Sequence, residues 1–241
     1  MALSEHNLVR PEPRITANEL ARFMVSGDTG RLGIIRRARE SGTPPRTRYK
    51  DARATLCNAL TDAASERRIL REAKTLFDQR AHDSSQSAFI RDDAEKSLQV
   101  IKAYQDMRNQ MAGYDYVPAP RRQPNLQLGG IEVSVSLDLL IHRSRGQADE
   151  IGGVLFRLTQ ADDGETDAAA TKRKDMGAYA ATLVQMHVAA NLAGQREPAY
   201  QLCWSVDVQA GDVHVAPRNF AQRAQNMDAA CKFIGAMWGQ A

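Results

Sequence analysis

Apolar residues recur about every 3.6 positions through the first half of the chain and every second position after about residue 130. The first pattern predicts a series of helices. The first helix follows Thr16, the second passes through residues 32–38 and ends near 41–42, and the others cover roughly 49–63, 65–80 and 85–111. The break at Ser26-Gly27-Asp28 separates the first two helices. We therefore expect a helical N-terminal half.

The start of the first helix has a local signature. Thr16 is followed three residues later by Glu19, the spacing of a capping box, in which each side chain binds the backbone N–H at the other position. Ile15 precedes the pair and is placed to pack against the first turn. The sequence thus predicts a helix N-terminus at Thr16.

Strict alternation is clearest between Ile131 and Ile141, where every second residue is apolar and the residues between them include Glu132 and Asp138. This pattern predicts one strand with an apolar face and a polar, solvent-facing side. The elements expected after it are a strand at 153–159, a helix ending near 193, strands at 200–208 and 212–216 joined around 210–211, and a helix at 220–238.

The segment Val117–Pro124 contains three prolines and cannot continue a helix, so it marks the clearest internal boundary. We predict an α+β protein with a helical region at residues 1–116 and an α/β core at residues 125–241, a small mixed β-sheet flanked by helices. The helix at 85–111 is expected to pack either with the helical region or with this core.

Composition is that of an ordinary globular protein, with 43% apolar and 25% charged residues among 241. No apolar run approaches the roughly 20 residues of a membrane span, and the N-terminal segment lacks the apolar stretch of a secretory signal. The three cysteines, Cys57, Cys203 and Cys231, form neither a disulfide pattern nor a zinc knuckle. We expect a cytoplasmic protein with no membrane partner.

Charge is unevenly distributed, although the net charge of the chain is only +3. The segment 31–53 has eight basic residues against two acidic ones. Its candidate nucleic-acid-binding residues are Arg31, Arg36, Arg37, Arg39, Arg46, Arg48 and Lys50. Such a cluster can bind phosphate groups or an acidic protein partner, and it can equally be a solvated helix face.

The second half resembles the PD-(D/E)XK, or restriction-endonuclease-like, superfamily, and is most similar to its RecB-type branch. Residues 126–141 look like the strand that carries the metal-binding aspartate of that family, with Asp138 in its place. Residues 152–158 look like the strand that carries its acid-x-lysine motif, and the helix containing Tyr179 looks like the one that packs across the sheet. The resemblance covers roughly residues 90–216 and implies a restriction-endonuclease-like core.

The resemblance also implies a catalytic chemistry, which this sequence departs from. Carboxylates on neighbouring strands would hold Mg²⁺ or Mn²⁺ against a phosphate, and a lysine would help to activate water. Here Leu155 occupies the acid position and Arg157 the lysine position. A repaired site would use Asp138 with Glu150 from the strand entry and Glu95 from the preceding helix. Otherwise Asp138 is a solvent-side strand residue, or Arg157 neutralises it across two strands, which is the interpretation we favour.

These observations favour a protein without catalytic activity or cofactor that binds nucleic acid or another protein, within a bacterial or phage DNA-processing or defence assembly. A metal-dependent nuclease with a migrated site, using Asp138, Glu150 and Arg157, is the first alternative. A scaffold subunit, homo-oligomeric or bound to a protein partner, is the second.

Overall fold

The computed structural model describes residues 8–41, 48–146, 148–159 and 165–240. It is an α+β fold in which a helical N-terminal half precedes mixed sheets with flanking helices, as the sequence predicted. Among the described helices, none combines the length and apolar character that a membrane crossing requires.

A five-stranded sheet forms the centre of the fold, with the strand order β10-β9-β8-β7-β4. Its strands are β4 (Asp115–Pro118), β7 (Leu139–Arg145), β8 (Ala148–Arg157), β9 (Glu197–Asp207) and β10 (Asp212–Val215). Only β8 and β9 are parallel; the other neighbours are antiparallel. Because parallel neighbours need a long crossover connection, the helix α6 (Asp167–His187) and the turn of π-helix after it, Val188–Leu192, lie between these two strands in the sequence.

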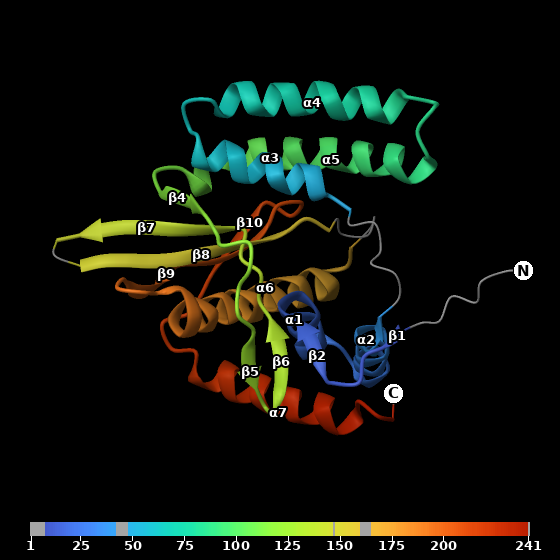
Figure 1. Cartoon of the computed structure of the whole chain (residues 1–241), viewed down its shortest axis with the longest axis vertical. Coiled ribbons are helices and arrows are strands. Elements are labelled where there is room, and N and C mark those ends of the chain that lie inside the picture. Colours follow the sequence, from blue (N-terminus) through green and yellow to red (C-terminus); the bar gives the residue numbers. More distant parts are fainter. Residues whose placement is uncertain (1–7, 42–47, 147, 160–164, 241) are drawn as a thin grey trace, which may run out of the picture.

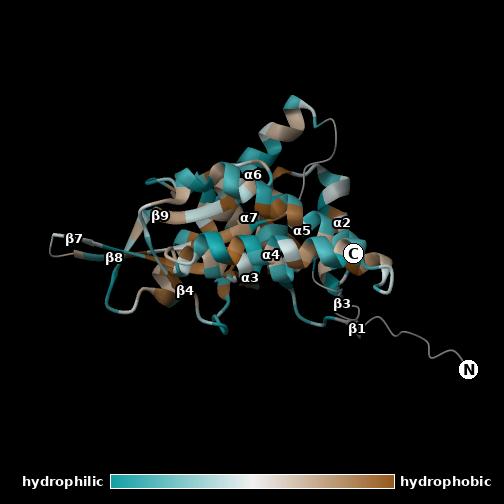
Figure 2. Cartoon of the chain, turned by 90° about the horizontal axis from the view of Figure 1, so that it is seen from above, coloured by the Kyte–Doolittle hydropathy of each residue, from teal (hydrophilic) through white to brown (hydrophobic). Residues whose placement is uncertain are grey.

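Three helices cover one face of this sheet (Figure 1). They are α3 (Lys50–Thr61), α4 (Glu66–His82) and α5 (Ala88–Met107), which continues as a short 3-10 helix, Arg108–Met111. Buried side chains such as Tyr104 of α5, Phe156 of β8 and Trp204 of β9 share one apolar cluster there. The outermost helix, α4, faces the viewer in Figure 2 and is mostly hydrophilic. The helix that the sequence predicts at 85–111 therefore packs in the same cluster as the sheet.

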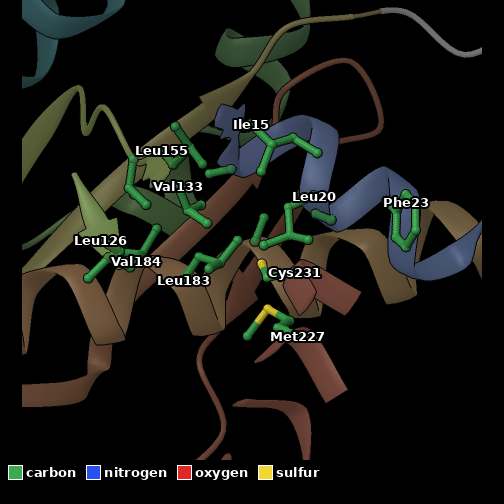
Figure 3. Close-up of a cluster of buried hydrophobic side chains, with 14 of the residues drawn as sticks. Ile15, Leu20, Phe23, Leu126, Val133, Leu155, Leu183, Val184, Met227 and Cys231 are labelled. Carbon is green, nitrogen blue, oxygen red and sulfur yellow. The ribbon is translucent and has the colours of Figure 1, made fainter. Parts of the chain in front are cut away.

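The opposite face of the sheet carries α6 and a second apolar cluster, part of which is drawn in Figure 3. This cluster includes residues of α1 (Ala17–Val25), α2 (Asp28–Arg39), α7 (Ala221–Met237) and a three-stranded sheet of β2 (Arg14–Thr16), β6 (Ile131–Ser134) and β5 (Leu126–Leu128). Leu20, Val133, Leu183 and Cys231 come from four different elements and are fully buried in it. A two-stranded pair, β1 (Leu8–Val9) and β3 (Glu40–Ser41), completes the fold.

The predicted N-terminus of the first helix is confirmed in atomic detail. The Glu19 N–H donates to Thr16 Oγ1 at 3.3 Å, and the Thr16 N–H donates to the Glu19 carboxylate at 3.0 Å. Ile15 is buried beside them. The strands expected at 200–208 and 212–216 are also present as β9 and β10, with Gly211 in the left-handed region at φ 72° in the turn.

The single strand expected at 131–141 is wrong. The chain forms β6 in the small sheet, leaves strand geometry at residues 135–138 and re-enters as β7 in the large sheet. Val133 and Val135 belong to the cluster around α6, whereas Leu139 and Ile141 belong to the cluster around α3–α5. Apolar and polar residues continue to alternate where the chain passes from the small sheet to the large one, because both clusters are apolar. The sequence pattern therefore does not reveal which cluster a residue enters.

Candidate functional site

Asp138 lies at this crossing, directly before β7, and both oxygens of its carboxylate accept hydrogen bonds from protein donors. Arg53 of α3 donates from Nη1 to both carboxylate oxygens, at 2.7 and 2.6 Å. The Phe156 N–H of β8 donates to Oδ2 at 2.7 Å. The side chain is only 8% exposed, so the prediction of a solvent-facing Asp138 is wrong. The break in strand pairing at residues 135–138 turns this side chain inward toward α3.

The electrostatics of Asp138 reflect two opposing effects. Burial raises the pKa of its carboxyl group, while the Arg53 guanidinium and the Phe156 N–H oppose that rise. Arg53 also donates from Nη2 to the Phe156 carbonyl at 3.1 Å, which fixes the guanidinium against β8. Both carboxylate oxygens thus face donors where a metal ion would need free lone pairs.

Arg157 does not neutralise Asp138, so the pairing favoured from the sequence is wrong. Its Nη2 lies 3.1 Å from the Asp207 carboxylate of the neighbouring strand β9. Arg173 of α6 binds the same carboxylate through Nε and Nη2, at 2.7 and 2.6 Å. The strand register explains why Arg157 pairs with Asp207, because the two residues are directly opposite each other in the parallel pair of β8 and β9. Burial lowers the pKa of Arg157, and the Asp207 charge opposes that effect.

Glu150 lies away from Asp138 along the sheet. Glu150 is opposite Arg143 on β7 and accepts from its Nε at 2.6 Å. Asp138 adjoins the residue opposite Val154, so about five residues of strand separate it from the Arg143–Glu150 pair, roughly 16 Å at 3.3 Å per residue. Glu95 is on the exposed side of α5. Within the described residues, no three histidine, cysteine, aspartate or glutamate side chains gather as a metal site would require.

The predicted basic cluster is divided between the two sides of the large sheet. Arg31, Arg36, Arg37 and Arg39 are on α2, which packs against α1 and β2 and shares the apolar cluster of α6, whereas Lys50 begins α3 on the opposite face. Arg46 lies outside the described residues. The seven candidates therefore do not form one continuous surface within the described chain.

Several of these cations already have protein partners. Arg31 pairs with Asp28 at 3.5 Å and lies over the Phe23 ring, 5.3 Å from its centroid. Arg48 pairs with Asp92 of α5 and stacks on the Phe89 ring. Such pairs fix the ends of helices, and they leave less of each charge for an external ligand.

Arg36, Arg37 and Lys50 remain exposed, and none of them forms an ion pair with another residue in the described ranges. Arg36 and Arg37 are adjacent in the last turn of α2, where the helix dipole favours positive charge. Their guanidinium groups are free to make bidentate contacts with phosphate or carboxylate oxygens.

Arg53 is the residue that the sequence did not single out as part of a site. It belongs to the basic segment 31–53, but the residue it binds is 85 positions away. A pairing over that distance leaves no periodic signal in the sequence. Only the packing of α3 against the start of β7 brings the two groups together.

No model of a known protein family matches this chain, and neither does any curated protein sequence.

Proposed function

We propose that the protein binds the phosphate backbone of nucleic acid without cleaving it, through the exposed end of α2. The resemblance of residues 126–141 and 152–158 to PD-(D/E)XK nucleases supports a nucleic-acid ligand and a degenerate restriction-endonuclease-like core. The observation that carries the proposal is a contrast between two sets of charges. The carboxylate that a nuclease would need is bound by Arg53, whereas Arg36 and Arg37 are exposed and unpaired with any described acidic residue.

The chemistry on the α2 surface suits backbone recognition more than base recognition. Two adjacent guanidinium groups can each bind a phosphate and release counterions, an interaction that does not depend on sequence. A bacterial or phage DNA-processing or defence assembly is the setting that the resemblance suggests for such a subunit.

The test is a titration of the purified protein onto supercoiled plasmid, with and without Mn²⁺, at about 50 and about 200 mM salt. We expect a mobility shift that weakens with salt and no nicking. The R36A/R37A variant should bind more weakly and with a salt slope lower by about 2, because two phosphate contacts are lost.

The matched control is R121A/R122A, which removes two adjacent exposed arginines from the loop between β4 and β5. Equal weakening by both variants would contradict a site on α2. Nicking that needs Mn²⁺ and disappears in D138A would overturn the non-catalytic proposal in favour of the nuclease. An unshifted plasmid would overturn nucleic-acid binding in favour of a scaffold subunit.

A further inference from the structure

A groove of about 580 Å³ is lined by residues of α4, of α5 and of the 3-10 helix that continues α5. The residues on which its chemistry depends are Glu66, Arg67, Arg71, Lys74, Gln105 and Arg108. Four of them are basic and one is acidic. None of them belongs to the basic segment at 31–53, so the groove is a separate feature.

Three of the cations form a row along one side of α4. Arg67, Arg71 and Lys74 have the spacing i, i+4, i+7, which places them on one face with about 5–6 Å between neighbouring Cβ atoms. All three are exposed, and none forms an ion pair within the described chain. By contrast, Arg68 of the same helix pairs with Glu72 at 3.2 Å. Three of the four cations that line the groove thus have no ion-pair partner among the described residues.

Glu66, the single acidic residue of the groove, does not cancel the charge of these three cations, because it is already paired with Arg108. Arg108 donates to the Glu66 carboxylate from Nε at 2.7 and 2.9 Å and from Nη2 at 2.6 Å. Tyr104 donates its hydroxyl to the same carboxylate at 3.0 Å. Glu66 is 6% exposed, while the Arg108 side chain is 47% exposed.

This arrangement holds the Arg108 guanidinium in a fixed position at the edge of the groove. Its Nη1 makes no hydrogen bond to a described residue, because Nε and Nη2 carry all the contacts with Glu66. A guanidinium that is oriented in advance loses less side-chain entropy when it binds an anion. The groove therefore presents one guanidinium held by Glu66 together with a row of three exposed cations.

We propose that this groove binds an oligophosphate, a ligand with at least two neighbouring phosphate groups. The spacing of the α4 cations suits several linked anions better than a single one, and the lining has no aromatic ring on which a base could stack. The ligand chemistry is shared by a free polyphosphate chain and by the backbone of a nucleic acid. The site does not rest on the function proposed for α2.

The experiment is isothermal titration of the full chain with inorganic tripolyphosphate at low salt, with orthophosphate as the comparison. We expect tripolyphosphate to bind, and orthophosphate to bind much more weakly. The R71A/K74A variant should lose at least about tenfold in affinity, since each charge-assisted contact is worth about that much. Both side chains are exposed, so the fold should be retained, which circular dichroism would verify.

The matched control is R68A/K102A, which also removes one arginine and one lysine from exposed positions of α4 and α5 but leaves the groove lining intact. Its affinity should change less than about threefold. No heat of binding with tripolyphosphate, or an equal loss in both variants, would overturn the proposal.

A second arm distinguishes the sources of the ligand. An oligonucleotide without terminal phosphates that displaces tripolyphosphate would identify a nucleic-acid backbone, and failure to displace it would identify a free oligophosphate. Binding at α2 and binding in the groove are tested separately, because R36A/R37A should still bind tripolyphosphate with unchanged affinity.

Discussion

Arg53 and Asp138 are 85 residues apart in the chain, yet their side chains form a two-oxygen ion pair with distances of 2.7 and 2.6 Å. The pair joins the helical half to the large sheet at the point where the chain crosses from the small sheet. It engages both oxygens of the Asp138 carboxylate.

We expect R53A to destabilise the protein by about 2–3 kcal/mol, because it leaves the buried Asp138 carboxylate without its cation. The double variant R53A/D138N should recover part of that loss, since the uncompensated charge is gone. Urea unfolding at pH 7 measures both. The control is R68A, which breaks an exposed pair with Glu72 and should cost no more than about 0.5 kcal/mol. Equal losses in R53A and R68A would contradict a stabilising role for the pair.

His187 should be neutral at pH 7 and should lower stability in acid. Its ring is buried between Gln123, 3.1 Å from Nε2, and Asn191, 3.0 Å from Nδ1, and burial lowers its pKa to about 4. The unfolded chain takes up this proton near pH 6.5 and the folded chain only near 4, so stability falls as the pH drops between those values.

By pH 5 the loss from His187 should be about 2 kcal/mol, and the H187Q variant should not show it. Urea unfolding of the parent protein and of H187Q between pH 7 and pH 5 measures how the free energy of unfolding of each depends on pH. An NMR titration of the His187 ring with a midpoint near 6.5 would contradict a buried, neutral imidazole.

Glu66 should contribute stability that is lost at lower pH. The hydrogen bonds from Arg108 lower its pKa below the ordinary value of 4.5, and the Tyr104 hydroxyl adds to this effect. A depressed carboxyl pKa stabilises the fold above pH 4.5, and this contribution disappears as the pH falls through the folded-state value.

The E66Q variant should therefore be less stable than the parent by about 1.5–3 kcal/mol at pH 7, and its stability should depend less on pH between 5 and 3. Thermal unfolding across that range is the measurement. A parallel pH dependence in both proteins would show that the Glu66 carboxylate does not carry the effect.

Gly152 should tolerate no side chain. It lies at the irregularity where β8 and β9 shift register, and a Cβ there would come within 2.1 Å of the Leu202 carbonyl oxygen. Because that obstacle is backbone, G152A should cost about 1–3 kcal/mol or more. In G239A the added methyl meets nothing within 4 Å, so this control should change stability little. Chemical denaturation of the two variants compares them directly.

Features set by neighbouring residues were predictable from the sequence, and features set by distant contacts were not. The Thr16–Glu19 capping box and the β9–β10 hairpin around Gly211 are local, and the structure has both. The parallel pairing of β2 with β6 joins residues more than 100 positions apart and was missed. The same holds for the partners of Asp138 and Arg157, since charge patterns do not encode which acid each arginine meets.

The candidate site shows the same division. The assignment of Asp138 as a metal-binding aspartate, and of Leu155 as a departure from a nuclease motif, stays a prediction from the sequence, whereas the ion pair of Asp138 with Arg53 came only from the structure. The row of cations on α4 was not singled out from the sequence, and the groove also depends on Glu66 and Arg108, which come together only when α4 packs on α5.

The two outer strands of the large sheet are unlike each other in a way that affects self-association. Each edge strand has only four residues and one aspartate, Asp115 in β4 and Asp212 in β10, but only β4 ends at a proline, Pro118, which has no N–H to donate. Short edge strands, charged residues and prolines are features by which natural proteins prevent the edge strands of two copies from pairing with each other. The β4 edge should thus resist aggregation, and any chain that extended this sheet would find more backbone donors along β10.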